Sequence, residues 1–294
     1  MNIWRFLKKC FTDPAAAEVS AKLVARSFYS QCYWSLNPSK SLLHHLPNGG
    51  ILLLEPGHSF THCFYPGVDQ YEPDVRLALR YFLKPGDYFI DCGANIGYFS
   101  IEAGKLVGEA GKVISIEANP ITFSLLERNL KLNQLGIPIH CALTSQRGEV
   151  DLFMPVEGGD VYSSLRKGKL VSGGSIESFK VLGQTLDDIV HEQCLPKVDL
   201  VKIDIEGAEL DVLNSATNVL STFRPVIITE YGTNTWPSFG ATPKDLKNLA
   251  KKYSYLLKMF DMSTKRFVSV TEDIWLSPYA NIIMLPEERL AEFG

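Results

Sequence analysis

Short apolar runs alternate with amphipathic segments along the chain from about residue 71 onward. The apolar runs are rich in Val, Ile and Phe and predict buried strands, whereas the segments between them carry apolar residues three and four positions apart and predict helices. The predicted strands lie at 88–91, 112–118, 137–143, 198–207 and 224–232, and the predicted helices at 71–82, 98–108, 119–133 and 208–220. Regular alternation of this kind predicts an α/β fold, in which a mostly parallel sheet carries helices on both faces.

The C-terminal part of the chain departs from this alternation. A predicted helix from Thr242 is followed by three predicted strands, at 253–261, 265–270 and 281–286, with no helix between them. Consecutive strands suggest an antiparallel edge on the sheet. A Gly- and Ser-rich stretch at 156–178 also interrupts the pattern, and it either covers a bound acceptor or is a loop without regular structure.

The N-terminal part has a pattern of its own. Residues 14–36 predict a helix, and residues 49–67 predict two short strands around a Pro-Gly turn. We therefore expect a small helical and β cap over residues 1–70 and a main domain over residues 71–294.

Composition narrows the class of protein. With 294 residues, of which 46% are hydrophobic, the chain can bury a full core. Lys and Arg number 29 against 33 Asp and Glu, which gives a net charge of −4, and no run of like charges suggests a nucleic-acid-binding face. The six cysteines form no CxxC pair, so we expect reduced thiols and a cytoplasmic protein. Arg5, Lys8 and Lys9 interrupt the apolar residues near the start, so we expect no integral membrane segment. These patterns do not indicate an oligomeric state.

The sequence DCGANIG, which follows the apolar pair Phe89–Ile90, connects the first strand of the main domain to a helix. Gly93 and Gly97 allow the backbone to approach a ligand closely, and Asn95 tolerates unusual backbone angles. The loop lacks the third glycine of the dinucleotide fingerprint, and the carboxylate of Asp91 suits an ammonium better than a pyrophosphate. Taken alone, the glycines also suit a tight turn and Asp91 a helix cap.

An acidic residue stands about twenty positions beyond this loop, at the end of the second strand. There the carboxylate of Glu117 can accept hydrogen bonds from both hydroxyls of a ribose, although it would also suit the positive end of a helix dipole. With the loop, it implies a ligand that has a ribose and a positive charge and no phosphate. S-adenosylmethionine fits that description.

The stretches PGDYFIDCGANIGYFS, VISIEANP, VDLVKIDIEGAELDVL and RPVIITEYG occur in this order. By them the sequence resembles the FkbM family of S-adenosylmethionine-dependent methyltransferases, over about residues 70–285. The resemblance implies a seven-stranded Rossmann-like sheet of the class I methyltransferase type. It also implies methyl transfer, usually to oxygen, on a small molecule or glycan such as a sugar or secondary metabolite.

The resemblance further implies cofactor-binding residues. These are Asp91, Gly93, Asn95 and Gly97 around the methionine moiety, Glu117 on the ribose, and Glu72 of the YEP stretch as a residue that closes the pocket. Many methyltransferases place an acidic or polar residue near the adenine after the third strand, whereas this chain has Ala142 there, so the backbone or Ser145 would serve.

The stretch KIDIEGAE carries the candidate chemistry. Asp204 and Glu206 lie two positions apart at a strand end, and Glu230 ends the neighbouring strand. Three converging carboxylates raise one another's pKa values unless a lysine such as Lys202 or a cation neutralises them. The group is therefore a candidate base, or a divalent metal site with Asp204 and Glu230 as ligands. In the structural alternative, Glu206 or Glu209 caps the next helix and Asp204 bonds backbone amides beside the cofactor.

Other residues are candidates for the acceptor side. His62, in the predicted cap, is a further candidate base, and Tyr231, Asn234 and Trp236 follow the fifth strand, where they could line an acceptor pocket. Trp236 also suits a role in anchoring that loop. The predicted function is S-adenosylmethionine-dependent O-methyl transfer. The alternatives are a nicotinamide-dependent oxidoreductase on the same fold and a non-catalytic cofactor-binding module.

Overall fold

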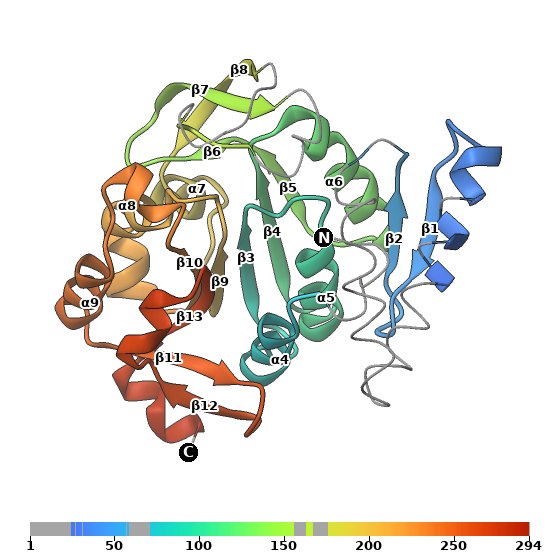
Figure 1. Ribbon diagram of the computed structural model, residues 1–294. Helices are drawn as coiled ribbons and strands as arrows, with labels where there is room; N and C mark the ends of the chain where they lie inside the picture. Colours follow the sequence, from blue (N-terminus) through green and yellow to red (C-terminus); the bar gives the residue numbers. More distant parts are fainter. Residues whose placement is uncertain are drawn as a thin grey trace.

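The computed structural model describes residues 25–26, 28–30, 32–56, 58, 71–155, 163–166 and 176–293. Its centre is an eight-stranded sheet with the strand order β12-β11-β13-β10-β9-β3-β4-β5 (Figure 1). These strands are β3 (Tyr88–Cys92), β4 (Lys112–Glu117), β5 (Ile137–His140), β9 (Leu200–Ile203), β10 (Val226–Gly232), β11 (Tyr255–Asp261), β12 (Arg266–Ser269) and β13 (Tyr279–Pro286).

Strand direction confirms the predicted fold class. The five adjacent strands β10, β9, β3, β4 and β5 run parallel to one another. Strand β13 is antiparallel to both of its neighbours, β10 and β11. The sheet has one strand more than the seven that the resemblance implied, because β12 pairs antiparallel with the outer strand β11. The predicted antiparallel edge is therefore present and is extended by a hairpin.

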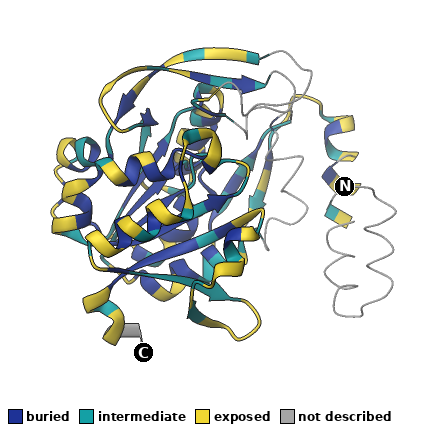
Figure 2. Ribbon diagram, turned by 60° about the vertical axis from the view of Figure 1, so that its left-hand side comes forward, coloured by how far each residue is buried: buried dark blue, intermediate teal, exposed yellow. Residues whose placement is uncertain are grey.

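Helices cover both faces of this sheet. Figure 1 shows α4 (Pro73–Phe82), α5 (Tyr98–Val107) and α6 (Pro120–Asn133) on one side, and α7 (Leu186–Glu192), α8 (Glu209–Ser215) and α9 (Pro243–Lys252) on the other. Shorter helical turns are η3 (Val219–Phe223), η4 (Trp236–Phe239), η5 (Glu272–Leu276) and η6 (Glu287–Phe293). Buried residues fill the layers between sheet and helices, and the exposed ones lie on the outer helix faces (Figure 2). In the described ranges, none of the helices has the length and apolarity that crossing a bilayer requires.

Capping residues stabilise the starts of two helices. The side-chain oxygen of Asn119 accepts hydrogen bonds from the first turn of α6, and Pro120 follows it. Thr242 and Asp245 form the capping box of α9.

A smaller sheet follows the third parallel strand and was only partly predicted. It consists of β6 (Ala142–Leu143), β7 (Gly148–Pro155) and β8 (Ile176–Gln184) in the order β6-β8-β7. The single strand predicted at 137–143 is wrong, because the chain leaves the central sheet after His140 and its next residues pair with β8. The apolar run continues through the change of sheet, so hydrophobicity alone cannot reveal the break.

The N-terminal segment contains a hairpin in a different place from the predicted one. Strand β1 (Leu42–His45) pairs with β2 (Ile51–Leu54) across a turn at 46–50. The strand expected before Pro56–Gly57 is present as β2, where it pairs with β1, and most of the strand expected after that turn lies outside the described residues. The described residues between 25 and 36 are helical, as predicted, and the domain boundary at residue 70 stays a prediction.

Candidate active site

Strand register brings charged side chains together at the carboxyl edge of the sheet. Asp91 of β3 lies beside Lys202 of β9, and Lys202 lies beside Ile228 of β10. Because side chains alternate along a strand, Glu230, two residues after Ile228, continues on the same face of the sheet. Asp204, two residues after Lys202, is held there by an ion pair, with 2.9 Å between Lys202 Nζ and Asp204 Oδ2.

Lys202 is the cation at the centre of this group. Only 2% of the residue is exposed, and its ammonium also lies 4.9 Å from the ring centroid of Phe99. Burial works against the charged form, but the carboxylates of Asp204, Glu72 and Asp91 outweigh it and raise the pKa of Lys202 above its usual range. The lysine is therefore charged at any physiological pH.

A pocket opens above the carboxyl ends of β3, β4 and β9. Its walls come from the loops after these strands, from β6, and from the segment 163–165. Among the predicted site residues, it is lined by Gly93, Asn95, Glu117, Ala142, Asp204 and Glu206. The other predicted cofactor residues, Glu72, Asp91 and Gly97, are not among the residues that line it.

The glycine loop passes directly over the loop that follows β9. Gly93 has φ +78°, and a Cβ at this position would lie 1.8 Å from the backbone oxygen of Asp204. No other residue type fits that crossing. Gly97 has a different role, because its Cβ would lie 2.9 Å from Leu126 Cδ1, so it allows α5 to pack against α6.

Glu117 ties the glycine loop to the start of α6. Its Oε2 accepts a hydrogen bond from the backbone N–H of Asn95 at 2.9 Å, and its Oε1 accepts one from that of Asn119 at 2.8 Å. Burial raises the pKa of Glu117 to about 7, although these backbone donors favour the ionised form. The carboxylate is thus fixed in orientation on one side and lines the pocket on the other.

Asp91 lies below the pocket floor. It is 1% exposed, and its Oδ2 accepts a 2.6 Å hydrogen bond from Ser100 Oγ, which in turn accepts one from Ser115 Oγ. Burial raises the pKa of Asp91, and the charge of Lys202 opposes that shift. The carboxylate therefore links β3, β4, β9 and α5.

The YEP stretch contributes a residue that the sequence analysis did not single out. Tyr71 lines the pocket, and its ring contacts those of Tyr98 and Phe99, with centroids 5.7 and 5.8 Å away. Glu72 precedes α4 with φ +38°, and burial raises its pKa to about 7 while Lys202 acts against the shift. The only signal for Tyr71 in the sequence is its place beside Glu72.

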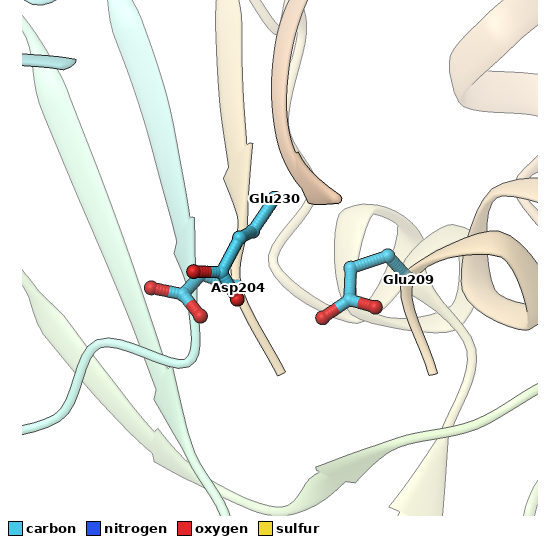
Figure 3. A group of neighbouring side chains, drawn as sticks. All are labelled: Asp204, Glu209 and Glu230. Carbon is cyan, nitrogen blue, oxygen red and sulfur yellow. The ribbon is translucent and has the colours of Figure 1, made fainter. Parts of the chain in front are cut away.

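A third carboxylate joins Asp204 and Glu230, and it is that of Glu209. One carboxylate oxygen from each of these three residues lies within 4.8 Å of the others (Figure 3). The sequence analysis expected Glu206 in this position. Glu206 has φ +63° and the following glycine has φ +112°, so the chain turns sharply and α8 then brings Glu209 back to the group.

The electrostatics of the three carboxylates differ. Burial raises the pKa of Glu230 to about 10, and the charges of Asp204, Glu206 and Glu209 add to the shift. Burial also raises the pKa of Glu209 to about 7, against the backbone N–H groups of Ile205 and Gly207, which donate to its Oε1 at 2.9 Å each. Without a cation, Glu230 therefore carries a proton at neutral pH.

The remaining candidates are structural or lie elsewhere. Tyr231 donates to the backbone oxygen of Trp275, and Trp236 donates to that of Glu230, and both side chains are buried. The anchoring role of Trp236 is confirmed, and Asn234 points to solvent. His62 lies outside the described residues.

The described part of the 156–178 stretch reaches the pocket. Ser163 Oγ accepts a 2.8 Å hydrogen bond from Asn119 Nδ2, and Ser164 pairs with Phe153 of β7. The guanidinium of Arg166 lies 5.3 Å from the ring centroid of Phe239, in the turn after β10. Residues 163–166 therefore span from the β4 side of the pocket toward the β10 side.

Comparison with known proteins agrees with this geometry. A sequence model of the methyltransferase FkbM domain matches residues 91–257, which include the glycine loop, Glu117 and the three carboxylates. The chain belongs to the FkbM methyltransferase family.

Two proteins of similar sequence, from Sordaria araneosa and Haloferax volcanii, are both named methyltransferases. Methyltransferase sdnD of Sordaria araneosa is 31% identical over 159 residues, which cover 45% of this chain and 61% of that protein. Hexuronic acid methyltransferase AglP of Haloferax volcanii is 28% identical over 180 residues, covering 60% and 67% respectively. Among solved structures, M. jannaschii TYW2 in complex with AdoMet aligns with 84% of each chain at 16% identity and a TM-score of 0.43. The FkbM assignment does not depend on that weak structural likeness.

Proposed function

We propose that this protein is an S-adenosylmethionine-dependent methyltransferase that methylates a hydroxyl oxygen of a small molecule or glycan. One observation carries the cofactor assignment. The pocket is lined by the carboxylates of Glu117, Asp204 and Glu206, and its lysine, Lys202, is already paired with Asp204. An acidic pocket of this kind suits a cationic ligand with a ribose and disfavours the pyrophosphate of a nicotinamide cofactor.

The residues present fit the cofactor. Glu117 would accept the ribose hydroxyls, because its two oxygens are already oriented by backbone donors. Gly93 and Asn95 line the pocket, and their backbone would lie along the methionine moiety. Ala142 lines the pocket near the expected adenine and offers no polar side chain, so its backbone would serve. Bound S-adenosylmethionine supplies a methyl group on a sulfonium.

Oxygen as the methylated atom is supported by the acids at the strand ends. A sugar hydroxyl is a poor nucleophile at neutral pH and must lose its proton during transfer. Lys202 stabilises the charge of Asp204, so Asp204 is the carboxylate best prepared to accept that proton. Glu230 carries a proton at neutral pH when no cation is bound, and it is therefore less suited to the task. The similarity to the hexuronic acid methyltransferase AglP supports a sugar-like acceptor.

Calorimetric titration tests this proposal. We expect S-adenosylhomocysteine to bind the full chain and NAD not to bind. Binding of NAD alone would overturn the proposal in favour of an oxidoreductase. If S-adenosylhomocysteine binds, a mass-spectrometric screen of sugars, uronic acids and glycans for methylated products then separates an enzyme from a non-catalytic binding module.

A further inference from the structure

The carboxylates at the β9 and β10 ends concentrate negative charge in a small buried space. Asp204, Glu209 and Glu230 each place one carboxylate oxygen within 4.8 Å of the others. The negative charges of Glu206 and Glu72 also act on Glu230. Lys202 offsets one of them through its ion pair with Asp204. Several carboxylates in a site of low polarity are stable only if protons or a further cation reduce their charge.

Glu209 supplies the observation that separates these possibilities. The residue is 1% exposed, and its Oε1 accepts the two backbone hydrogen bonds that shape the 205–207 turn. Its Oε2 is buried and has no hydrogen-bond partner among the described residues. Figure 3 shows the Glu209 carboxylate directed toward Asp204 and Glu230. A buried carboxylate oxygen without a donor is costly, and a bound cation would satisfy it.

We propose that Asp204, Glu209 and Glu230 hold a hard divalent cation of the Mg²⁺, Mn²⁺ or Ca²⁺ class at the edge of the pocket. Such ions prefer carboxylate oxygens, at about 2.0–2.6 Å from the metal. Ligand oxygens around one ion therefore lie up to roughly 4–5 Å apart, and the 4.8 Å limit on the three carboxylates falls in this range. Asp204 also lines the pocket, so an ion held by this residue would lie at the pocket's edge.

The cation would bring the acceptor into the reaction, and this part of the inference rests on the proposed function. A hydroxyl oxygen that enters the coordination sphere of a divalent ion would lose its proton to water more readily, because the ion stabilises the alkoxide, and Asp204 would then act as a ligand and not as the base. Binding of the ion itself does not depend on the methyl acceptor.

Manganese binding to the full chain, with no cofactor present, tests the site. Electron paramagnetic resonance follows the loss of the free Mn²⁺ signal, and we expect one saturable site per chain from which Mg²⁺ or Ca²⁺ displaces Mn²⁺. Glu209→Gln and Glu230→Gln should each weaken Mn²⁺ binding by roughly tenfold or more, since each removes a ligand charge. Asp211→Asn, which changes an exposed carboxylate on the same helix α8, should bind Mn²⁺ as the unaltered protein does.

Two outcomes overturn the inference: no saturable Mn²⁺ binding by the unaltered chain, or equal binding by the unaltered chain and Glu230→Gln. Circular dichroism checks that each variant folds. If Glu209→Gln unfolds because the 205–207 turn is lost, Glu230→Gln decides alone. S-adenosylhomocysteine titration of the same samples keeps the two proposals separate, because an unaltered chain that binds S-adenosylhomocysteine but no Mn²⁺ rejects the metal site only.

Discussion

At the scale of single residues, Glu117 shows how one side chain can serve both the fold and the pocket. Its two oxygens accept backbone hydrogen bonds from the glycine loop and from the residue that caps α6. These bonds fix the carboxylate before any ligand arrives, so little ordering is needed on binding. Because burial raises its pKa to about 7, its charge changes within the range where enzymes work.

This pKa leads to a prediction for cofactor binding. The ribose hydroxyls donate to an ionised carboxylate, so the free protein must lose a proton from Glu117 in order to bind well. In the free protein the carboxyl is mostly protonated at pH 6 and mostly ionised at pH 8. We therefore expect the affinity for S-adenosylhomocysteine, measured by calorimetry, to rise about tenfold from pH 6 to pH 8.

Glu117→Gln is the matched control for this experiment. The amide keeps the shape of the side chain but has no titratable charge, so the rise in affinity between pH 6 and pH 8 should disappear. At pH 8 the variant should bind more weakly by roughly 1–3 kcal/mol, the cost of losing a charged acceptor. An unaltered pH profile in Glu117→Gln would remove this residue from the ribose site.

Local spacing predicted some of the site residues and could not predict others. The crossing at Gly93 and the position of Glu117 follow from a strand, a tight loop and the next strand end, all close in sequence. Glu209, and not Glu206, joins the carboxylate group because the backbone at Glu206 and Gly207 has positive φ angles, and residue spacing does not reveal such a turn. Tyr71 was missed because its contacts, with Tyr98 and Phe99, are made only when α4 packs on α5.

At the scale of elements, the docking of the N-terminal hairpin depends on two asparagines one helical turn apart. Asn129 and Asn133 of α6 each accept a hydrogen bond from a backbone N–H of β2 and donate one to a backbone oxygen of β2, at Leu53 and Ile51 respectively. The side-chain amides thus take the place of a neighbouring strand on the open edge of β2.

Removing one of these amides should loosen the hairpin without loosening the sheet. Asn133→Ala leaves the Ile51 N–H without its acceptor, so we expect its hydrogen exchange to accelerate by about fivefold, for a loss of roughly 1 kcal/mol. Amides of the central strand β4 should exchange at their usual rate. Lys131→Ala, at an exposed position on the same helix, should leave the exchange rates of both the Ile51 amide and the β4 amides unchanged. If the Ile51 amide exchanges as slowly in Asn133→Ala as in the unaltered protein, Asn133 does not dock the hairpin.

The elements that the sequence predicted well are those whose apolar residues recur at a regular spacing. Parallel strands and the helices between them were placed to within a few residues, because their burial pattern is set by one sheet. The hairpin at 42–54 and the small sheet of β6, β7 and β8 were misplaced or missed, because their pairing is decided by contacts with other elements. Asn129 and Asn133 illustrate the difficulty, since asparagines in a helix give no sequence signal for a docked strand.

At the scale of the whole molecule, ion pairs fall into two kinds. Exposed pairs such as Lys180–Asp151 and Arg147–Glu192 lie on the surface, where water screens them and each contributes little. The pair Lys202–Asp204 is different, because Lys202 is buried among carboxylates in the middle of the sheet. Breaking a buried pair leaves an uncompensated charge, which is much more costly than losing a surface pair.

Stability measurements on two lysine variants should therefore give contrasting results. Lys202→Met leaves the buried carboxylate of Asp91 and its neighbours without a cation, and we expect it to lower the free energy of unfolding by about 3–5 kcal/mol. Lys197→Met removes a lysine that is 44% exposed and paired with Asp87 and Asp199, and it should cost less than about 1 kcal/mol. Urea-induced unfolding, followed by circular dichroism, compares the two. Equal free energies of unfolding for the two variants would mean that the charges at the strand ends are neutralised without Lys202. If the double variant Lys202→Met, Asp91→Asn regains part of the lost free energy of unfolding, the cost lies in the unpaired carboxylates.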